Sequence, residues 1–186
     1  MKRLFDLFFS VSLILLLAVP MLIVSFAVLM TTKGPALHWS KRVGLDNEIF
    51  LMPKFRTMLL RTPDLATHLI KNPNEYLTPI GGFLRSTSLD ELPQLFSILK
   101  GDMSFVGPRP ALFNQYDLIR LRTEKNLDQL LPGLTGWAQV NGRDECPIIE
   151  KVELDFEYLQ RGSIKLDLKI LWMTFLKVIK RDNILH

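Results

Sequence analysis

The sequence contains a single cysteine, Cys146, and therefore has no means of forming an internal disulfide. This excludes the disulfide-stabilised class of small secreted domains and fits a reducing compartment. None of the three histidines lies near Cys146 in the sequence to activate its thiol, so we interpret it as passive. Internal repeats, low-complexity tracts and a linker to a second domain are also absent. The 186 residues therefore predict one domain.

Charged side chains are absent from residues 7–30. As an α-helix this run would be about 35 Å long, enough to cross a hydrocarbon core of about 30 Å. Lys2 and Arg3 would suit the basic end of a signal peptide, but the run is too long and no small-residue cleavage site stands out. We therefore expect a membrane segment.

Pro20 lies just past the middle of this run and predicts a break or bend, because it removes one backbone donor. Basic residues lie on both sides, which by the positive-inside tendency places both ends in the cytoplasm. A helix–break–helix that enters and leaves the same leaflet would place both basic flanks in the cytoplasm. A kinked spanning helix with its more basic C-terminal side inside is the alternative, and the residues leave both open. Asp6 can pair with Arg3 one turn earlier.

The rest of the chain alternates short elements with Gly/Pro-rich turns. We expect two extended pieces within residues 36–58 around a turn at 44–47, partial helix in 61–76, helices at 92–99, 111–130 and 147–158, and a loop at 131–136. Residues 164–180 predict an amphipathic helix that lies on a membrane, although a core-facing helix fits nearly as well. The net charge of +4 fits an anionic membrane or a phosphorylated substrate, and no nucleic-acid motif accompanies it.

Asp90 and Glu91 are adjacent carboxylates at an expected helix start. Ser88 and Glu91 match a capping box, in which both side chains satisfy free backbone donors. Pro93 would then be the fifth helical residue, where proline destabilises a helix. With Asp90 as the cap, Pro93 falls in the tolerated first turn. We therefore expect Asp90 at the helix mouth, where backbone donors also attract phosphate oxygens.

Arg85 and Arg109 flank these carboxylates and can clamp phosphate with two parallel hydrogen bonds. Prolines on both sides of Arg109 restrict its backbone. A carboxylate can accept a phosphoryl group, and magnesium prefers carboxylate and phosphate oxygens. The functional interpretation is that Asp90 attacks phosphorus while Glu91 helps to hold a divalent cation. Further candidate phosphate-binding residues are Lys54, Arg56 and Arg143.

Long ordered blocks extend this pattern over nearly the whole chain: residues 2–6, 54–58, 84–95, 99–110 and 132–143, then Asp155 and residues 167–170. In these blocks the chain resembles the bacterial sugar transferases, the small monotopic phosphoglycosyl transferases that start glycan assembly on a polyprenyl carrier. The resemblance implies transfer of a sugar-1-phosphate from a UDP-sugar to undecaprenyl phosphate, with release of UMP. It implies that Asp90 carries the phosphosugar covalently and that Asp90 and Glu91 ligate Mg²⁺.

The implied fold is mainly α with a few short strands, in a monotopic membrane protein with an N-terminal re-entrant helix–break–helix and interfacial amphipathic helices. Residues 1–32 would form the hairpin and 33–186 the catalytic domain, with 164–180 on the membrane surface. The active site would face the cytoplasm at the bacterial inner membrane. The expected partners are a UDP-sugar, undecaprenyl phosphate and membrane lipid, without nucleic acid, and a homodimer is compatible with the sequence. Many relatives break the membrane helix at Ser-Pro, whereas this chain has Val19-Pro20 and lacks the hydroxyl that would bond a freed carbonyl.

Two other functions fit parts of the sequence. A metal-dependent glycosyltransferase would pass the sugar directly to an acceptor and release UDP. A membrane-anchored interaction protein would use its basic side to bind anionic lipid, and Asp90→Asn would leave its function intact. We favour the phosphosugar transferase, because lipid binding gives no reason to place carboxylates between Arg85 and Arg109.

Overall fold

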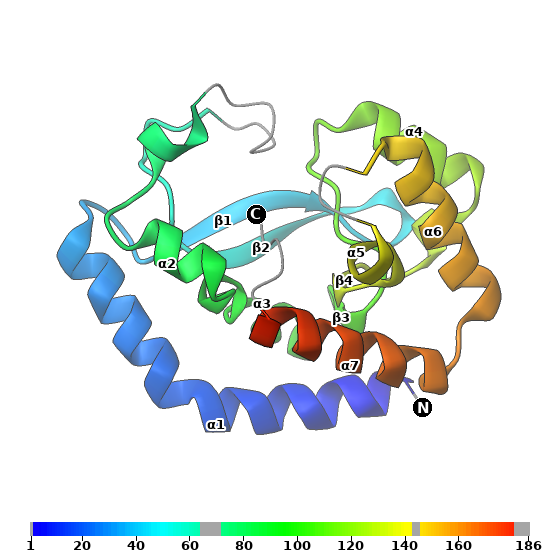
Figure 1. Ribbon diagram of the computed structural model, residues 1–186, viewed down its shortest axis with the longest axis horizontal. Coiled ribbons are helices and arrows are strands. Elements are labelled where there is room, and N and C mark those ends of the chain that lie inside the picture. The colour runs from blue at the N-terminus through cyan, green and yellow to red at the C-terminus, as the bar shows by residue number, and fades with distance from the viewer. Residues whose placement is uncertain (1, 64–71, 143–145, 181–186) are drawn as a thin grey trace.

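A computed structural model describes residues 2–63, 72–142 and 146–180 (Figure 1). The helices are α1 (Lys2–Thr31), α2 (Gly81–Ser86), α3 (Gln94–Lys100), α4 (Tyr116–Glu124), α5 (Trp137–Asn141), α6 (Ile148–Arg161) and α7 (Ile164–Lys180). The strands are β1 (Leu37–Val43), β2 (Ile49–Phe55), β3 (Ser104–Val106) and β4 (Gly133–Thr135). The prediction of a mainly helical fold with a few short strands is confirmed.

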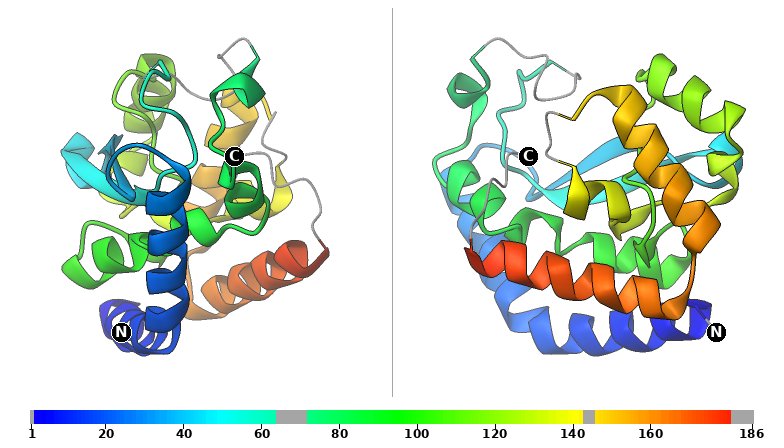
Figure 2. Two further views of the ribbon diagram at one scale, coloured as in Figure 1. Left: turned by 90° about the vertical axis from the view of Figure 1, so that its left-hand side faces the viewer. Right: turned by 45° about the vertical axis from the view of Figure 1, so that its right-hand side comes forward.

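Helix α1 runs without interruption through Pro20, so the expected break into two helices is wrong and Pro20 only bends one helix. The helix is long and apolar enough to cross a membrane. Figures 1 and 2 show it bent near its middle, as expected where proline leaves a backbone carbonyl without its donor. Both ends contact the rest of the chain. Near its start, Lys2 reaches Asp167 of α7, and near its end Val24 and Val28 pack with Phe55. Between these contacts its large apolar side chains are mostly exposed.

The strands form two small sheets in the described part of the chain. Strands β1 and β2 pair antiparallel around a turn at residues 44–47, as predicted. Strands β3 and β4 pair in parallel, so the prediction of a plain loop at 131–136 is wrong. Glycine-rich sequence has low strand propensity, and here the partner strand and burial decide the conformation instead. This pairing fixes the segment that follows β3, which carries Arg109.

The helix predicted over residues 111–130 is shorter than expected: α4 covers Tyr116–Glu124, and a separate 3₁₀ turn covers Leu127–Gln129. Asn126 separates the two with φ of 56°, a left-handed conformation that a continuous helix excludes. Helix α3 ends as predicted at Gly101, whose φ is 106°. Half of residues 61–76 lies outside the described residues, and Pro73–Tyr76 forms a 3₁₀ turn.

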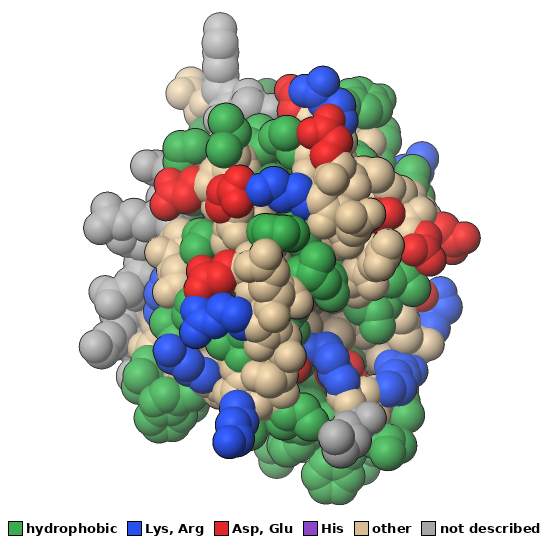
Figure 3. All heavy atoms as spheres, turned by 90° about the vertical axis from the view of Figure 1, so that its right-hand side faces the viewer, with side chains coloured by type: hydrophobic (Ala, Val, Ile, Leu, Met, Phe, Trp, Pro, Cys, Tyr) green, Lys and Arg blue, Asp and Glu red, His purple; other side chains and the backbone are tan. Residues whose placement is uncertain are grey.

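Helix α7 faces two environments. Leu166 and Ile170 are buried in the main core with Ile98 and Met103, whereas Trp172 and Phe175 remain exposed. Helices α1 and α7 lie along the same side of the molecule (Figures 1 and 2). Hydrophobic side chains gather on the corresponding lower edge in Figure 3, and Lys and Arg side chains form a band directly above them. This arrangement is typical of a protein that rests on a membrane.

Candidate active site

Asp90 and Glu91 lie in a 3₁₀ turn, Leu89–Glu91, between α2 and α3. Ser88 precedes it with φ of 55° and makes no side-chain capping bond. Helix α3 begins only after Pro93, so Asp90 is not its cap. Both capping interpretations are therefore wrong, because the left-handed residue ends one segment and a separate turn intervenes before α3. Both carboxylates are buried, but neither caps a helix, so capping does not explain why they are buried.

The Glu91 carboxylate binds two basic side chains from distant parts of the chain. Its Oε1 accepts hydrogen bonds from Lys54 Nζ at 2.7 Å and from Arg109 Nη2 at 3.0 Å. Lys54 comes from β2, and Arg109 follows β3. Burial lowers the pKa of Lys54, and the charge of Glu91 is the largest influence in the opposite direction. Together with the ionised Asp90 carboxylate, these three side chains form one unit in which two cations balance two carboxylates.

Asp90 is left incompletely bonded inside this unit. Its side chain is buried, and Oδ1 has no hydrogen-bond partner among the described residues. Burial raises the pKa of Asp90 to about 6, with Glu91 adding to the rise and Lys54, Arg85 and Arg109 opposing it. The carboxylate is consequently ionised near neutral pH while one oxygen is unbonded. Such an oxygen suits a nucleophile or a metal ligand.

The backbone around Arg109 is held by two further arginines. Arg122 Nη1 donates to the carbonyl oxygen of Arg109 at 2.8 Å, and Arg42 Nη1 donates to that of Pro110 at 3.0 Å. Arg122 is itself fixed by Asp155, whose Oδ2 accepts from Arg122 Nη2 at 2.6 Å. This chain of contacts holds the loop of Arg109 against α4 and α6, so that its guanidinium is presented to Glu91.

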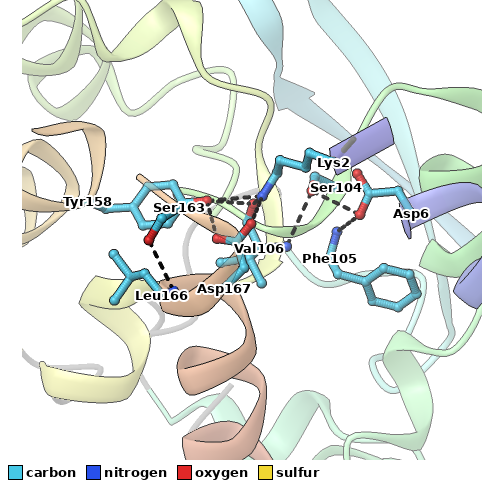
Figure 4. A network of polar contacts seen from close by, with 9 residues as sticks. All are labelled: Lys2, Asp6, Ser104, Phe105, Val106, Tyr158, Ser163, Leu166 and Asp167. Carbon is cyan, nitrogen blue, oxygen red and sulfur yellow. Dashed lines mark hydrogen bonds and ion pairs between the residues drawn. The ribbon is translucent and has the colours of Figure 1, made fainter. Parts of the chain in front are cut away.

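The start of α1 contacts β3, the strand that precedes this loop (Figure 4). Lys2 Nζ donates to Asp167 Oδ2 at 2.7 Å and to the carbonyl oxygen of Val106 at 2.9 Å. Tyr158 donates to Asp167 Oδ1 at 2.7 Å, and burial together with this bond raises its pKa, so the phenol stays protonated. Because Val106 directly precedes the loop of Arg109, the N-terminus of the membrane segment is mechanically connected to the site.

Asp6 adds to these contacts. Its Oδ1 accepts from Ser104 Oγ and from the backbone N–H of Phe105, each at 3.2 Å (Figure 4). Arg3 donates instead to the carbonyl oxygen of Ile98 at 2.7 Å, at the end of α3. The predicted pairing of Asp6 with Arg3 is therefore wrong: both side chains point into the protein and tie α1 to β3 and α3.

The structure brings most of the candidate residues together. Lys54, Arg85 and Arg109 all act electrostatically on Asp90 and Glu91, and burial lowers the pKa of Arg85. Arg56 is placed differently, packed beneath Gly34 at the turn that leaves α1. Arg143 lies outside the described residues.

Sequence reasoning missed Gln94 and Arg42. Both line a small hollow together with Met52, Glu91, Arg109 and Pro110. Gln94 is buried, and its Nε2 has no hydrogen-bond partner among the described residues. Its position four residues after Asp90, as a polar residue in an apolar segment, is the pattern that could have identified it.

Asp90 and Glu91 can supply some, but not all, of the ligands of a magnesium ion. Within residues 2–63, 72–142 and 146–180, no group of three or more His, Cys, Asp or Glu side chains is placed to hold a metal ion. Magnesium commonly binds one or two carboxylates and takes its other ligands from water and substrate phosphates. The unbonded oxygen of Asp90 and the neighbouring Glu91 meet that requirement, provided that a phosphate substrate is present.

Comparison with known proteins identifies the family. The family model described as bacterial sugar transferase matches residues 1–181. The uncharacterized sugar transferase EpsL of Bacillus subtilis (strain 168) is 41% identical, over 99% of this chain and 90% of its own length. The undecaprenyl-phosphate glucose phosphotransferase of Komagataeibacter xylinus is 39% identical over 98% of this chain, which spans 36% of that protein. The undecaprenyl-phosphate galactose phosphotransferase of Salmonella typhimurium is 34% identical over 98% of the chain and 41% of its own length. The chain belongs to the bacterial sugar transferase family.

Proposed function

We propose that the protein transfers a sugar-1-phosphate from a UDP-sugar to undecaprenyl phosphate and releases UMP. The observation that carries this proposal is the buried Asp90 carboxylate, whose Oδ1 has no hydrogen-bond partner among the described residues. Beside it, Glu91 holds Lys54 and Arg109 in place. The activities of relatives named as undecaprenyl-phosphate sugar phosphotransferases support the same reaction. It would be the first membrane step in assembly of a glycan such as O-antigen, capsule, exopolysaccharide or a glycoprotein glycan.

The first step forms an acyl phosphate on Asp90. Its free oxygen attacks the phosphorus that bears the sugar, a new P–O bond forms, and the bond to the other phosphate of UDP breaks. UMP leaves with the bonding electron pair. Arg85 and Arg109 balance the charge on the transferred group, since guanidinium pairs with phosphate through two parallel bonds. Lys54 holds Glu91 in place during this step.

The second step regenerates the enzyme. A phosphate oxygen of undecaprenyl phosphate attacks the same phosphorus, the bond to Asp90 breaks, and the carboxylate is restored. Bound through Asp90, Glu91 and substrate phosphates, Mg²⁺ would neutralise charge on the diphosphate. Splitting the transfer into two displacements lets the soluble donor and the lipid acceptor use one site in turn.

We further propose that α1 is re-entrant and that the site lies on the cytoplasmic face of the inner membrane. Lys2 contacts Asp167, and Val28 packs in a cluster with Phe55 and Leu84. Both ends of α1 therefore contact the same folded part of the chain. A helix that crossed the bilayer would place one end on the far side, about 30 Å away. The cytoplasmic face is where UDP-sugars are made. The exposed apolar residues of α7 support contact with the same membrane surface.

Product analysis tests the proposal. Purified protein incubated with UDP-sugars and undecaprenyl phosphate is expected to release UMP, and stopping the reaction before acceptor is added should leave a phosphosugar on Asp90, detectable by mass spectrometry. Asp90→Asn should abolish both, whereas Asp117→Asn, at a side chain that is 82% exposed, should change neither. Release of UDP would instead indicate direct glycosyl transfer. Full UMP release by the Asp90→Asn variant would rule out the covalent route.

A further inference from the structure

Arg56 carries a buried charge that the described residues do not compensate. The residue is 6% exposed, and its Nη1 is buried without a hydrogen-bond partner among the described residues. Buried guanidinium groups are normally paired with a carboxylate or phosphate, because an unpaired buried charge is costly. Arg122 in the same protein illustrates the usual solution, with Asp155 bonded to it. The isolation of Arg56 therefore points to an anionic ligand.

The surroundings of Arg56 place this ligand beside the turn that follows α1. Arg56 directly follows β2, and its backbone N–H donates to the carbonyl oxygen of Ala36 at 2.8 Å. Gly34, in the turn that leaves α1, lies directly over the guanidinium: a Cβ at Gly34 would be 2.4 Å from Nη1. Gly34 also has φ of 123°, which strongly favours glycine. The guanidinium is therefore covered by a turn that has no side chain at Gly34, at the end of the apolar helix α1.

The charges beside Asp90 belong to a different cluster. Lys54, Arg85 and Arg109 act on that carboxylate, and Arg56 makes no ion pair with either acid of the pair. Exposed Lys33, adjacent to Gly34, adds positive charge near the turn. The flanking helix α1 exposes apolar side chains such as Leu29 and Met30. An anion reaching this place from an apolar phase would be the head group of a lipid.

We propose that Arg56 binds the phosphate group of a membrane lipid at the exit turn of α1, in a site separate from the one at Asp90. The planar guanidinium suits a phosphate, and it is weakly hydrated enough to be buried with one. The phosphate can come from a bilayer phospholipid or from undecaprenyl phosphate. This site does not depend on the chemistry proposed for Asp90.

Thermal unfolding in a phosphate-free maltoside detergent tests the site. All variants carry Asp90→Asn, so turnover does not affect the result. Adding phosphatidylglycerol or undecaprenyl phosphate is expected to raise the Tm of the parent by several degrees. Arg56→Gln should lose this rise and weaken lipid binding about tenfold or more, and Arg56→Lys should show an intermediate loss. Without lipid, Arg56→Gln should unfold no earlier than the parent, because it removes an unpaired buried charge.

Controls separate the two lipid sources and the alternative of a structural role. Arg120→Gln, at a side chain that is 68% exposed on α4, removes the same charge and should keep the full rise in Tm. A rise with both lipids that Arg56→Gln loses assigns a general phospholipid site, and such an Arg56-dependent rise with undecaprenyl phosphate alone assigns the acceptor. An equal rise with inorganic phosphate overturns the lipid assignment. An unchanged rise in Arg56→Gln, or no rise in the parent, overturns the proposal.

Discussion

Arg122 donates a hydrogen bond from Nη1 to the backbone carbonyl oxygen of Arg109, 2.8 Å away, and so links a buried ion pair to the proposed phosphate clamp. The partner of Arg122 is Asp155, 33 positions further along the chain on α6. Neither Arg122 nor Asp155 bonds Asp90 or Glu91. Asp155 is therefore a positioning residue, which acts on the site through Arg122 and the backbone of Arg109.

Replacing Asp155 should destabilise the fold strongly. Asp155→Asn leaves Arg122 buried without a compensating charge, and the side chains of the pair are only 10% and 2% exposed. The expected loss in free energy of unfolding is about 3–5 kcal/mol, as for other broken buried pairs. Arg122→Met combined with Asp155→Leu should lose less than the sum of the single changes. Chemical denaturation in detergent measures both, and a loss no larger than that of Asp117→Asn would contradict the buried-pair interpretation.

The raised pKa of Asp90 predicts the acid limb of the pH–rate profile. Because attack requires the carboxylate, UMP release at low substrate should rise with pH and reach half its plateau at about pH 6, the pKa to which burial raises Asp90. An acid limb centred near pH 4, at the ordinary pKa of aspartate, would show that the ionisation of buried Asp90 does not limit the reaction.

The same pKa predicts an effect on stability. The pKa of Asp90 is about 6 in the folded protein against an ordinary value of 3.8, so its contribution to stability is present below pH 3.8 and lost as pH rises through about 6. In the Asp90→Asn variant this side chain has no charge at any pH, so the variant does not lose stability in this way. Relative to the parent, the variant should therefore gain stability between pH 4 and pH 8, by an amount on the order of 3 kcal/mol. Thermal unfolding at the two pH values measures the difference, and a constant difference would contradict the prediction.

Glu91→Gln should impair the reaction and shift its pH profile. Glu91 raises the pKa of Lys54 against the larger effect of burial, and it also raises the pKa of Asp90. Without its charge both pKa values should fall, and the profile should move to lower pH. Turnover should drop by roughly a hundredfold, since Lys54 and Arg109 lose the carboxylate that orients them. Glu153→Gln, at a surface pair with Lys125, is the matched control. A hundredfold loss without any shift would point to metal binding alone.

The outline of the fold was predictable wherever local sequence determines structure. The turn at residues 44–47, the end of α3 at Gly101 and the two C-terminal helices follow from turn residues and periodicity. Strand β4 was not predictable, because its conformation depends on pairing with β3, about 30 positions away. The capping prediction for Asp90 failed because Leu89–Glu91 forms a separate 3₁₀ turn and α3 begins only after Pro93.

The candidate site was predictable as a set of residue types but not as a set of contacts. Asp90, Glu91, Arg85 and Arg109 lie within one stretch of sequence, so their grouping could be inferred. The contact of Lys54 with Glu91 joins residues 37 positions apart, and nothing local indicates it. Arg56 shares a sequence block with Lys54, yet the structure places it beneath Gly34. Side-chain direction after the end of a strand depends on tertiary packing, which periodicity does not describe.

The arrangement of α1 predicts that both of its ends lie on the cytoplasmic side. Near its start Lys2 is bonded to Asp167, and near its end Val28 packs with Phe55, so the two ends contact one body. In a Cys146→Ser background, a cysteine inserted after Met1 and a second one from Lys41→Cys should both resist impermeant thiol reagents in intact cells. Both should react after the cells are opened, which controls for burial. Labelling of the first site alone in intact cells would mean that α1 spans the membrane and would contradict the re-entrant arrangement.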